Sequence, residues 1–206
     1  MSPMQINSTD SFERALGSSL QLIGKVPPNA VLDYFRLYSD TALTHSKRSQ
    51  ASLIHDHMID WAEKLLPAEF KLLDMRQRIL FNFKDQLLLQ FNKLESKARR
   101  AATNSSLQSL LFDETGEVGL PGFDAVLPLV TVGYVLKDDG VNLEGVYAVR
   151  FIHGIPEWSL KLDEGEDGGN VLTTIISPNA PTTTPSRIKR PSTGRPSINE
   201  FGSGQS

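Results

Sequence analysis

The first third of the chain places apolar residues at helical spacing. This spacing predicts three helices, over residues 11–25, 29–44 and 46–66. Gly24 and the Pro27-Pro28 pair are expected to end the first of them, because proline removes a backbone donor. The third separates apolar from charged residues on two sides, as a helix packed on a core does. An N-terminal helical layer is therefore expected.

The next segment predicts one long helix over residues 68–102, with Pro67 in the tolerated first turn. Its apolar positions recur at a heptad-like spacing, so the helix would be roughly 50 Å long and amphipathic. Its apolar stripe must be covered by the preceding helices or by a second copy of the chain. The residues predicted to form this interface are Leu80, Phe83, Leu87, Phe91 and Leu94.

After residue 128 the apolar period changes from helical to alternating. Segments 129–137, 146–153, 158–162 and 171–176 are rich in β-branched and aromatic residues and predict strands. The short, turn-like connections between them favour an antiparallel meander packed on the long helix.

The predicted fold class is α+β: a helical layer with one long helix, a small antiparallel meander and a disordered tail. This fold class divides the chain into three predicted regions: a helical region over residues 1–112, a sheet region over 113–177 and a tail over 178–206. The tail is rich in Pro, Ser, Thr and Arg and shows no periodicity, which is typical of disorder.

The net charge of −3 is unevenly distributed along the chain. Residues 44–104 carry +4, residues 105–169 carry −9, and residues 170–206 carry +3. No cysteine is present, so disulfides and thiolate chemistry are excluded and a cytoplasmic location is expected. No apolar run approaches the roughly 20 residues of a membrane-spanning helix, so no membrane association is expected.

One segment resembles a phosphate-binding loop only in part. Gly17, Gly24 and Lys25 match the two glycines and the lysine of such a loop. However, six residues rather than four separate the glycines. Val26 occupies the position of the metal-binding hydroxyl, and no strand precedes the segment. A helix that ends at a glycine is the preferred interpretation.

Residues of metal-ligating types occur in two clusters. His55 and His57 are two positions apart on a predicted helix and face different directions, so only His57 and Asp60 share a face. Residues 163–167 are dense in carboxylates but do not follow the ligand order of a calcium loop. A surface pair and a solvated acidic turn are preferred, and no cofactor or metal is expected.

Basic residues cluster at the end of the predicted long helix and in the tail. An Arg-Pro-Ser tripeptide occurs twice in the tail, and Gly-Arg-Pro resembles half of a minor-groove-binding core. A solubilising tail and an ordinary complement to the helix dipole are the alternatives. The candidate contacts to nucleic acid or to an acidic partner are Lys93, Lys97, Arg99, Arg100, Arg187, Lys189, Arg190 and Arg195.

Three functions are compatible with these patterns. The first is a non-enzymatic interaction or assembly protein whose long helix forms an oligomer or docks a protein partner, with a recruiting tail. The second is a nucleic-acid-associated protein that uses the basic helix end and the tail. The third is an enzyme with a dispersed site, for example around His153. No catalytic residue set is identified.

Overall fold

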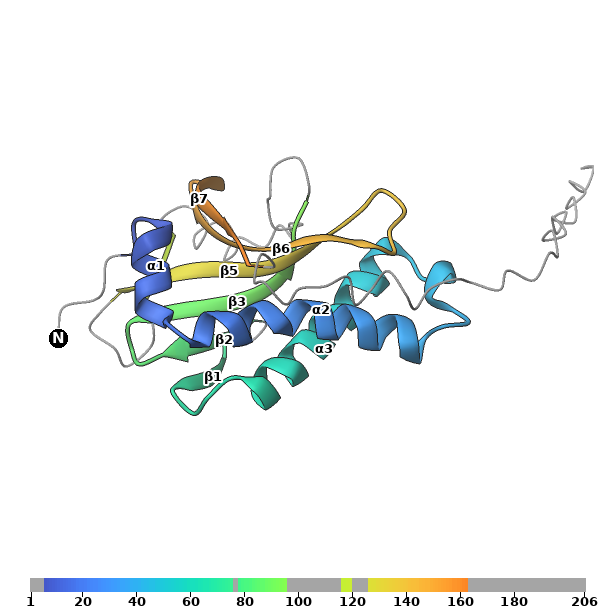
Figure 1. Ribbon diagram of the computed structural model, residues 1–206, viewed down its shortest axis with the longest axis horizontal. Helices are drawn as coiled ribbons and strands as arrows, with labels where there is room; N and C mark the ends of the chain where they lie inside the picture. Colours follow the sequence, from blue (N-terminus) through green and yellow to red (C-terminus); the bar gives the residue numbers. More distant parts are fainter. Residues whose placement is uncertain (1–5, 76–77, 96–115, 120–125, 163–206) are drawn as a thin grey trace, which may run out of the picture. The chain divides into compact units, whose positions relative to one another are not determined.

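The computed structural model describes residues 6–75, 78–95, 116–119 and 126–162. These residues contain three α-helices, a short 3₁₀ helix and one seven-stranded sheet (Figure 1). The helices are α1 (Thr9–Leu16), α2 (Ser19–Leu37), the 3₁₀ helix η1 (Ala42–Thr44) and α3 (Lys47–Leu65). The strands are β1 (Phe70–Asp74), β2 (Ile79–Phe83), β3 (Leu87–Lys93), β4 (Glu117–Gly119), β5 (Val126–Leu136), β6 (Leu143–Ile152) and β7 (Ile155–Lys161).

The predicted long helix over residues 68–102 is wrong. Its described part forms the antiparallel strands β1, β2 and β3. Lys84 and Asp85 both have positive φ, at 53° and 57°, so the chain reverses directly between β2 and β3. The Asn82 side chain stabilises this reversal, because it donates to the Asp85 carboxylate at 2.6 Å and accepts from the Asp85 N–H at 3.1 Å.

The apolar runs in this segment are buried on both faces of the sheet. Strand β3 is apolar at four of its seven positions, and its first five residues are buried. A strand with two covered faces needs no alternation, so its apolar run can also match a helical period. The heptad-like spacing was therefore a coincidence of two neighbouring buried strands.

The fold is a mixed sheet rather than a helical layer with a small meander. The strand order is β1-β2-β3-β5-β6-β7, and β4 pairs with one end of β5. Strands β3 and β5 are parallel, whereas all other pairs are antiparallel. Strands β5, β6 and β7 form the predicted meander close to the predicted positions. The predicted strand over residues 171–176 and the predicted tail lie outside the described residues.

Helix α2 continues through the Pro27-Pro28 pair, so the predicted break there is wrong. Proline costs a helix one backbone hydrogen bond, but α2 buries a broad face that includes Val26, Ala30 and Tyr34. This packing outweighs the lost bonds. Helix α3 begins and ends within one residue of its prediction. No helix in the described part of the chain is long and apolar enough to cross a membrane.

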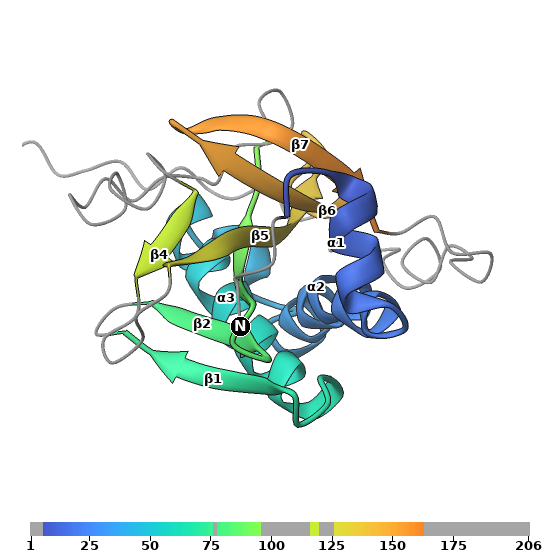
Figure 2. The ribbon, with the colours of Figure 1, turned by 90° about the vertical axis from the view of Figure 1, so that its left-hand side faces the viewer.

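Helices α2 and α3 pack on one face of the sheet, and α1 packs beside β7 (Figures 1 and 2). The main apolar core lies between these helices and the strands and includes Phe81, Phe91 and Val132. Alternate residues of the same strands point to the opposite face, where two smaller buried clusters are centred on Leu88 and Val149. The sheet is therefore apolar on both faces.

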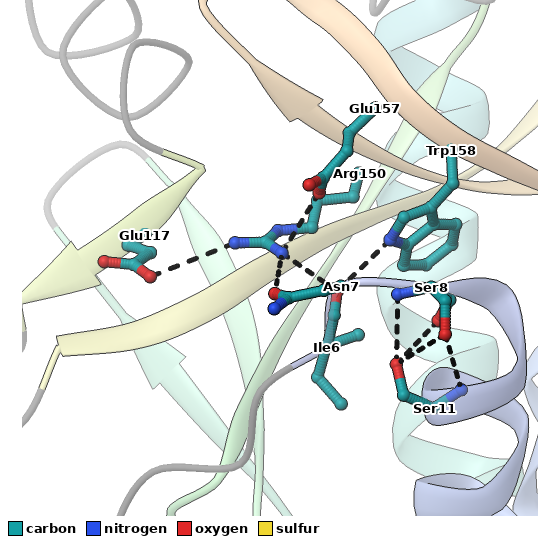
Figure 3. A network of polar contacts seen from close by, with 8 residues as sticks. All are labelled: Ile6, Asn7, Ser8, Ser11, Glu117, Arg150, Glu157 and Trp158. Atoms are coloured by element: carbon teal, nitrogen blue, oxygen red, sulfur yellow. Dashed lines mark hydrogen bonds and ion pairs between the residues drawn. The ribbon is translucent and has the colours of Figure 1, made fainter.

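A buried guanidinium fixes the N-terminal segment to the sheet (Figure 3). Arg150 on β6 is 5% exposed and donates to the Ile6 carbonyl and to the Asn7 side chain, both at 2.9 Å. It also pairs with Glu157 at 3.0 Å, and Trp158 donates to the same Ile6 carbonyl at 3.2 Å. These bonds place the start of α1 beside β7, so this network is structural.

Candidate anion-binding site

The five residues of the predicted helix interface lie in the interior of the sheet. All are 5% exposed or less. They do not share one surface, because Phe83, Leu87 and Phe91 face the helices whereas Leu80 and Leu94 belong to the clusters of the opposite face. Without the long helix, no continuous apolar stripe presents these side chains to a partner.

One of the predicted basic contacts can be placed in the structure. Lys93 is the last residue of β3 and is partly buried. The other seven predicted bases fall outside the described residues: Lys97, Arg99, Arg100, Arg187, Lys189, Arg190 and Arg195. The surroundings of Lys93 therefore define the candidate site.

The side chain of Lys93 lies on the helix-covered face. Leu87, Leu89 and Phe91 of the same strand belong to the core beneath the helices, and the alternation of a strand directs residue 93 the same way. Burial lowers the pKa of the Lys93 ammonium, and the positive charge of Lys47 lowers it further. No hydrogen bond or ion pair to the described residues holds this ammonium. The charge of the partly buried Lys93 is therefore disfavoured both by burial and by the charge of the exposed Lys47.

Lys47 brings the N-terminus of α3 to this region. The Ser46 hydroxyl caps the helix by accepting from the Ser49 N–H at 3.1 Å, whereas no described group accepts from the Lys47 and Arg48 N–H groups. The first turn contains no acid, although acids are favoured there. Two bases instead oppose the helix dipole, so this terminus is strongly positive.

Tyr134 connects the strand side of the site to the helix side. It pairs in register with Lys93 across the parallel junction, is fully buried, and its hydroxyl has no hydrogen-bond partner among the described residues. Burial raises the pKa of this hydroxyl, and nearby Tyr34 raises it further. The Tyr34 hydroxyl is hydrogen-bonded to His45 Nδ1 at 2.8 Å, directly before the cap of α3.

We define the basic corner as Tyr34 and His45, which share a hydrogen bond, Lys93 and Tyr134, which pair in register, and Lys47, whose charge lowers the pKa of Lys93. It lies at the carboxyl ends of the two parallel strands, where open sheets commonly bind ligands. A hydrogen bond of 3.0 Å from the Gln50 side chain to the Gly140 carbonyl fixes α3 to the neighbouring β5–β6 turn (Figure 1).

Two carboxylates close to the basic corner neutralise it only in part. Glu95 is exposed and partly offsets the lowering of the Lys93 pKa. Asp139 in the β5–β6 turn accepts from the Asn142 side chain at 2.6 Å and from the Val141 and Asn142 N–H groups at 2.9 Å. These bonds lower the pKa of Asp139 and occupy its oxygens within its own turn.

The other predicted motifs do not come together at a site. Gly17 caps α1, whereas Gly24 and Lys25 lie within α2, so they form no phosphate loop. The described residues hold no group of three or more potential metal ligands, and His55, His57 and Asp60 are spread along α3. His153 lies exposed in the β6–β7 turn at a φ of 52°. The acidic stretch 163–167 lies outside the described residues.

Sequence reasoning identified Lys93 and missed the other four residues of the basic corner. One available signal was the dipeptide Lys47-Arg48 directly after a Ser cap, without an acid in the same turn. Tyr34 and Tyr134 gave no signal, because a buried tyrosine follows the same apolar pattern as a phenylalanine.

Comparison with known proteins gives no assignment. The sequence matches no family model, no curated protein and no solved structure.

Replacing Lys93 by methionine is expected to leave the free energy of unfolding unchanged at pH 7 or to raise it by up to about 1 kcal/mol. The folded state lowers the pKa of Lys93 below its ordinary value of 10.5, so the charged form opposes folding. This cost is present at neutral pH and disappears as the pH rises from the folded-state pKa towards 10.5. Urea denaturation at pH 7 and pH 10 should show a gain that shrinks at the higher pH.

Lys71→Met on β1 is the matched control, because that lysine is exposed. A loss of more than 1 kcal/mol for Lys93→Met at pH 7 would show instead that a stabilising partner holds the ammonium.

Proposed function

We propose that this protein is a non-enzymatic interaction protein that binds an anionic group of its partner at the basic corner. The observation that carries this proposal is the ammonium of Lys93, which is partly buried on the helix-covered face of the sheet and has no acid paired with it among the described residues. An unpaired cation in such surroundings raises the free energy of the ligand-free protein. An anion would remove that cost on binding.

Helix α3 supplies the geometry for such an anion. Backbone N–H groups at a helix N-terminus point along the axis, and the helix dipole adds positive potential, so phosphates and carboxylates bind there. The backbone N–H groups of Lys47 and Arg48 have no acceptor in the described structure, and Lys93 lies on the sheet face that α3 covers. The site thus combines backbone donors with side-chain charges from two elements.

The predicted assembly role is changed by this proposal. Recruitment of a partner stays the proposed function, but the contacts move from an apolar helix stripe to a polar, charged corner. Binding is then expected to depend on salt, since solvent-exposed charges are screened within about 10 Å at 0.1 M ionic strength.

The test is calorimetric titration of the full chain with inorganic tripolyphosphate at 50 mM and 200 mM salt. Binding is expected at low salt, weakened at high salt, and reduced about tenfold or more by Lys93→Met, because a charge-assisted contact is lost. Lys71→Met, a lysine outside the site, should bind within about twofold of the unaltered protein. No binding by the unaltered protein, or equal losses in both variants, would overturn the proposal.

A further inference from the structure

Residues 6–16, which we call the N-terminal arm, are anchored to strands that lie far along the chain. Ile6 and Phe12 are fully buried, and the Phe12 ring lies 5.2 Å from that of Trp158 on β7. Arg150 and Trp158 both donate to the Ile6 carbonyl, at 2.9 Å and 3.2 Å (Figure 3). We call this receiving surface on β6 and β7 the arm slot. It holds the arm through a main-chain carbonyl and buried apolar side chains, as peptide-binding surfaces do.

A single glycine bends the chain between the arm and α2. Only Gly17 and Ser18 lie between α1 and α2. Ser18 already has helical dihedral angles, φ −64° and ψ −23°, and the Gly17 N–H donates to the Glu13 carbonyl at 2.8 Å, as in a helix. Gly17 itself has φ 52° and ψ −126°, a conformation that glycine adopts readily and other residues do not. The bend therefore depends on the conformation of one residue.

The sequence on both sides of this bend fits one continuous helix. Its apolar residues recur at spacings of four, four and three: Phe12, Leu16, Leu20 and Ile23. This spacing predicts a helix over residues 11–25, and the structure breaks that helix at Gly17. In the described part of the chain, no backbone group accepts from the Ser18 N–H. A continuous helix would pair this N–H with a carbonyl of α1, so straightening adds a backbone hydrogen bond.

From the one-residue bend and the distant slot we infer that the N-terminal arm is swapped between two copies of this chain. When Gly17 becomes helical, α1 continues along the axis of α2 and leaves its own slot. The arm then occupies the slot of a second copy, which returns its own arm. Swapping of identical elements is a low-cost route to dimers, because the contacts of the monomer are re-formed. This inference is independent of the anion site.

Release of the arm without a partner is the competing outcome, and the contacts of the arm disfavour it. Release would expose the core residues Ile6 and Phe12 to water and would remove two acceptors from the buried Arg150 guanidinium. Swapping keeps all of these groups covered. A short hinge held in a restricted conformation is also the arrangement that favours swapping. The second copy is therefore the expected occupant of the slot.

Analytical ultracentrifugation of the full chain tests the hinge in both directions. Gly17→Ala is expected to lower the dissociation constant of the dimer about tenfold or more, because alanine disfavours the bend and favours a helix. A Cβ atom at this position would meet nothing within 4 Å among the described residues, so the change acts through the backbone. Ser18→Pro is expected to remain monomeric, since its φ suits proline in the bend, whereas proline would break the straight helix.

Gly140→Ala is the matched control. Gly140 also has a positive φ, 69°, and open space around its Cβ position, but it lies in the β5–β6 turn. Alanine there should strain the backbone without promoting a dimer. Should Gly17→Ala fail to fold, refolding of the unaltered protein at high concentration is the second measurement. It is expected to yield a dimer that Ser18→Pro does not form.

Hydrogen exchange distinguishes a swapped dimer from any other. In the swapped dimer the α1 amides stay protected, because the arm still lies in a slot, and the Ser18 amide gains protection in the continuous helix. A folded Gly17→Ala protein that stays monomeric would overturn the inference. So would a dimer whose α1 amides exchange freely, or equal dimer formation by Gly140→Ala.

Discussion

Replacing Gly133 by alanine is expected to destabilise the protein by about 3 kcal/mol or more, because it forces apart the parallel strands that position the basic corner. A Cβ atom at this position would lie 2.2 Å from the Asn92 carbonyl oxygen and 2.7 Å from the Leu94 side chain. Both distances are far below van der Waals contact. The Asn92 oxygen is backbone and cannot rotate away, so strand β3 itself would have to move.

Strand β3 has little freedom to make that movement. Residues Leu88 to Lys93 pair in register with β5, and the Leu94 N–H donates to the Tyr134 carbonyl at 2.9 Å. A shift that relieves the clash would break this ladder beside Lys93 and Tyr134. Gly133→Ala should therefore also weaken anion binding, even in the fraction of molecules that stays folded.

Gly119→Ala is the matched control, since a Cβ atom there would meet nothing within 4 Å. Its free energy of unfolding should stay within about 0.5 kcal/mol of the unaltered protein. Urea denaturation followed by circular dichroism gives both values. Similar stability of the two variants would show that β3 and β5 are not as closely paired as the structure has them.

The sequence predicted correctly those elements whose apolar period is unambiguous. Helix α3 has a polar face, a serine cap and enough length for several turns, so its limits could be derived within one residue. Strands β5, β6 and β7 are rich in β-branched residues and separated by turn residues, and their positions were found for the same reason.

The central strands could not be predicted because burial on both faces removes the signal that distinguishes a strand from a helix. Strands β2 and β3 are short, nearly continuous apolar runs, joined by Lys84 and Asp85 rather than by the Asn-Gly or Asp-Gly of a recognisable hairpin. Nothing local marks the reversal. Once the two runs were joined into one helix, the parallel pairing of β3 with β5 could not be derived either.

The same error affected the candidate site. Lys93 was selected for the density of bases near the end of a helix that does not exist, and the other residues of the basic corner come from α2, α3, β5 and the segment before α3. Pairings such as Lys93 with Tyr134 join residues distant in sequence, and only the tertiary structure brings them together. A charge pattern along one segment cannot contain that information.

Replacing Arg150 by methionine is expected to cost about 3 kcal/mol of unfolding free energy. Methionine keeps an apolar stem of similar length, so the loss measures the polar contacts rather than a cavity. It would leave Glu157 without its cation, and the Asn7 side chain and Ile6 carbonyl without the donor shown in Figure 3. Trp158 would still donate to Ile6, so part of the docking should persist.

The loss should be concentrated at the N-terminal segment, because the contacts of Arg150 there join residues more than 140 positions apart. Hydrogen exchange is expected to quicken first in α1, which packs its Phe12 ring 5.2 Å from Trp158. Arg36→Met on the exposed side of α2 is the control and should change neither stability nor exchange in α1. Unchanged protection of α1 in Arg150→Met would mean that apolar packing alone, through Ile6 and Phe12, holds this segment on the sheet.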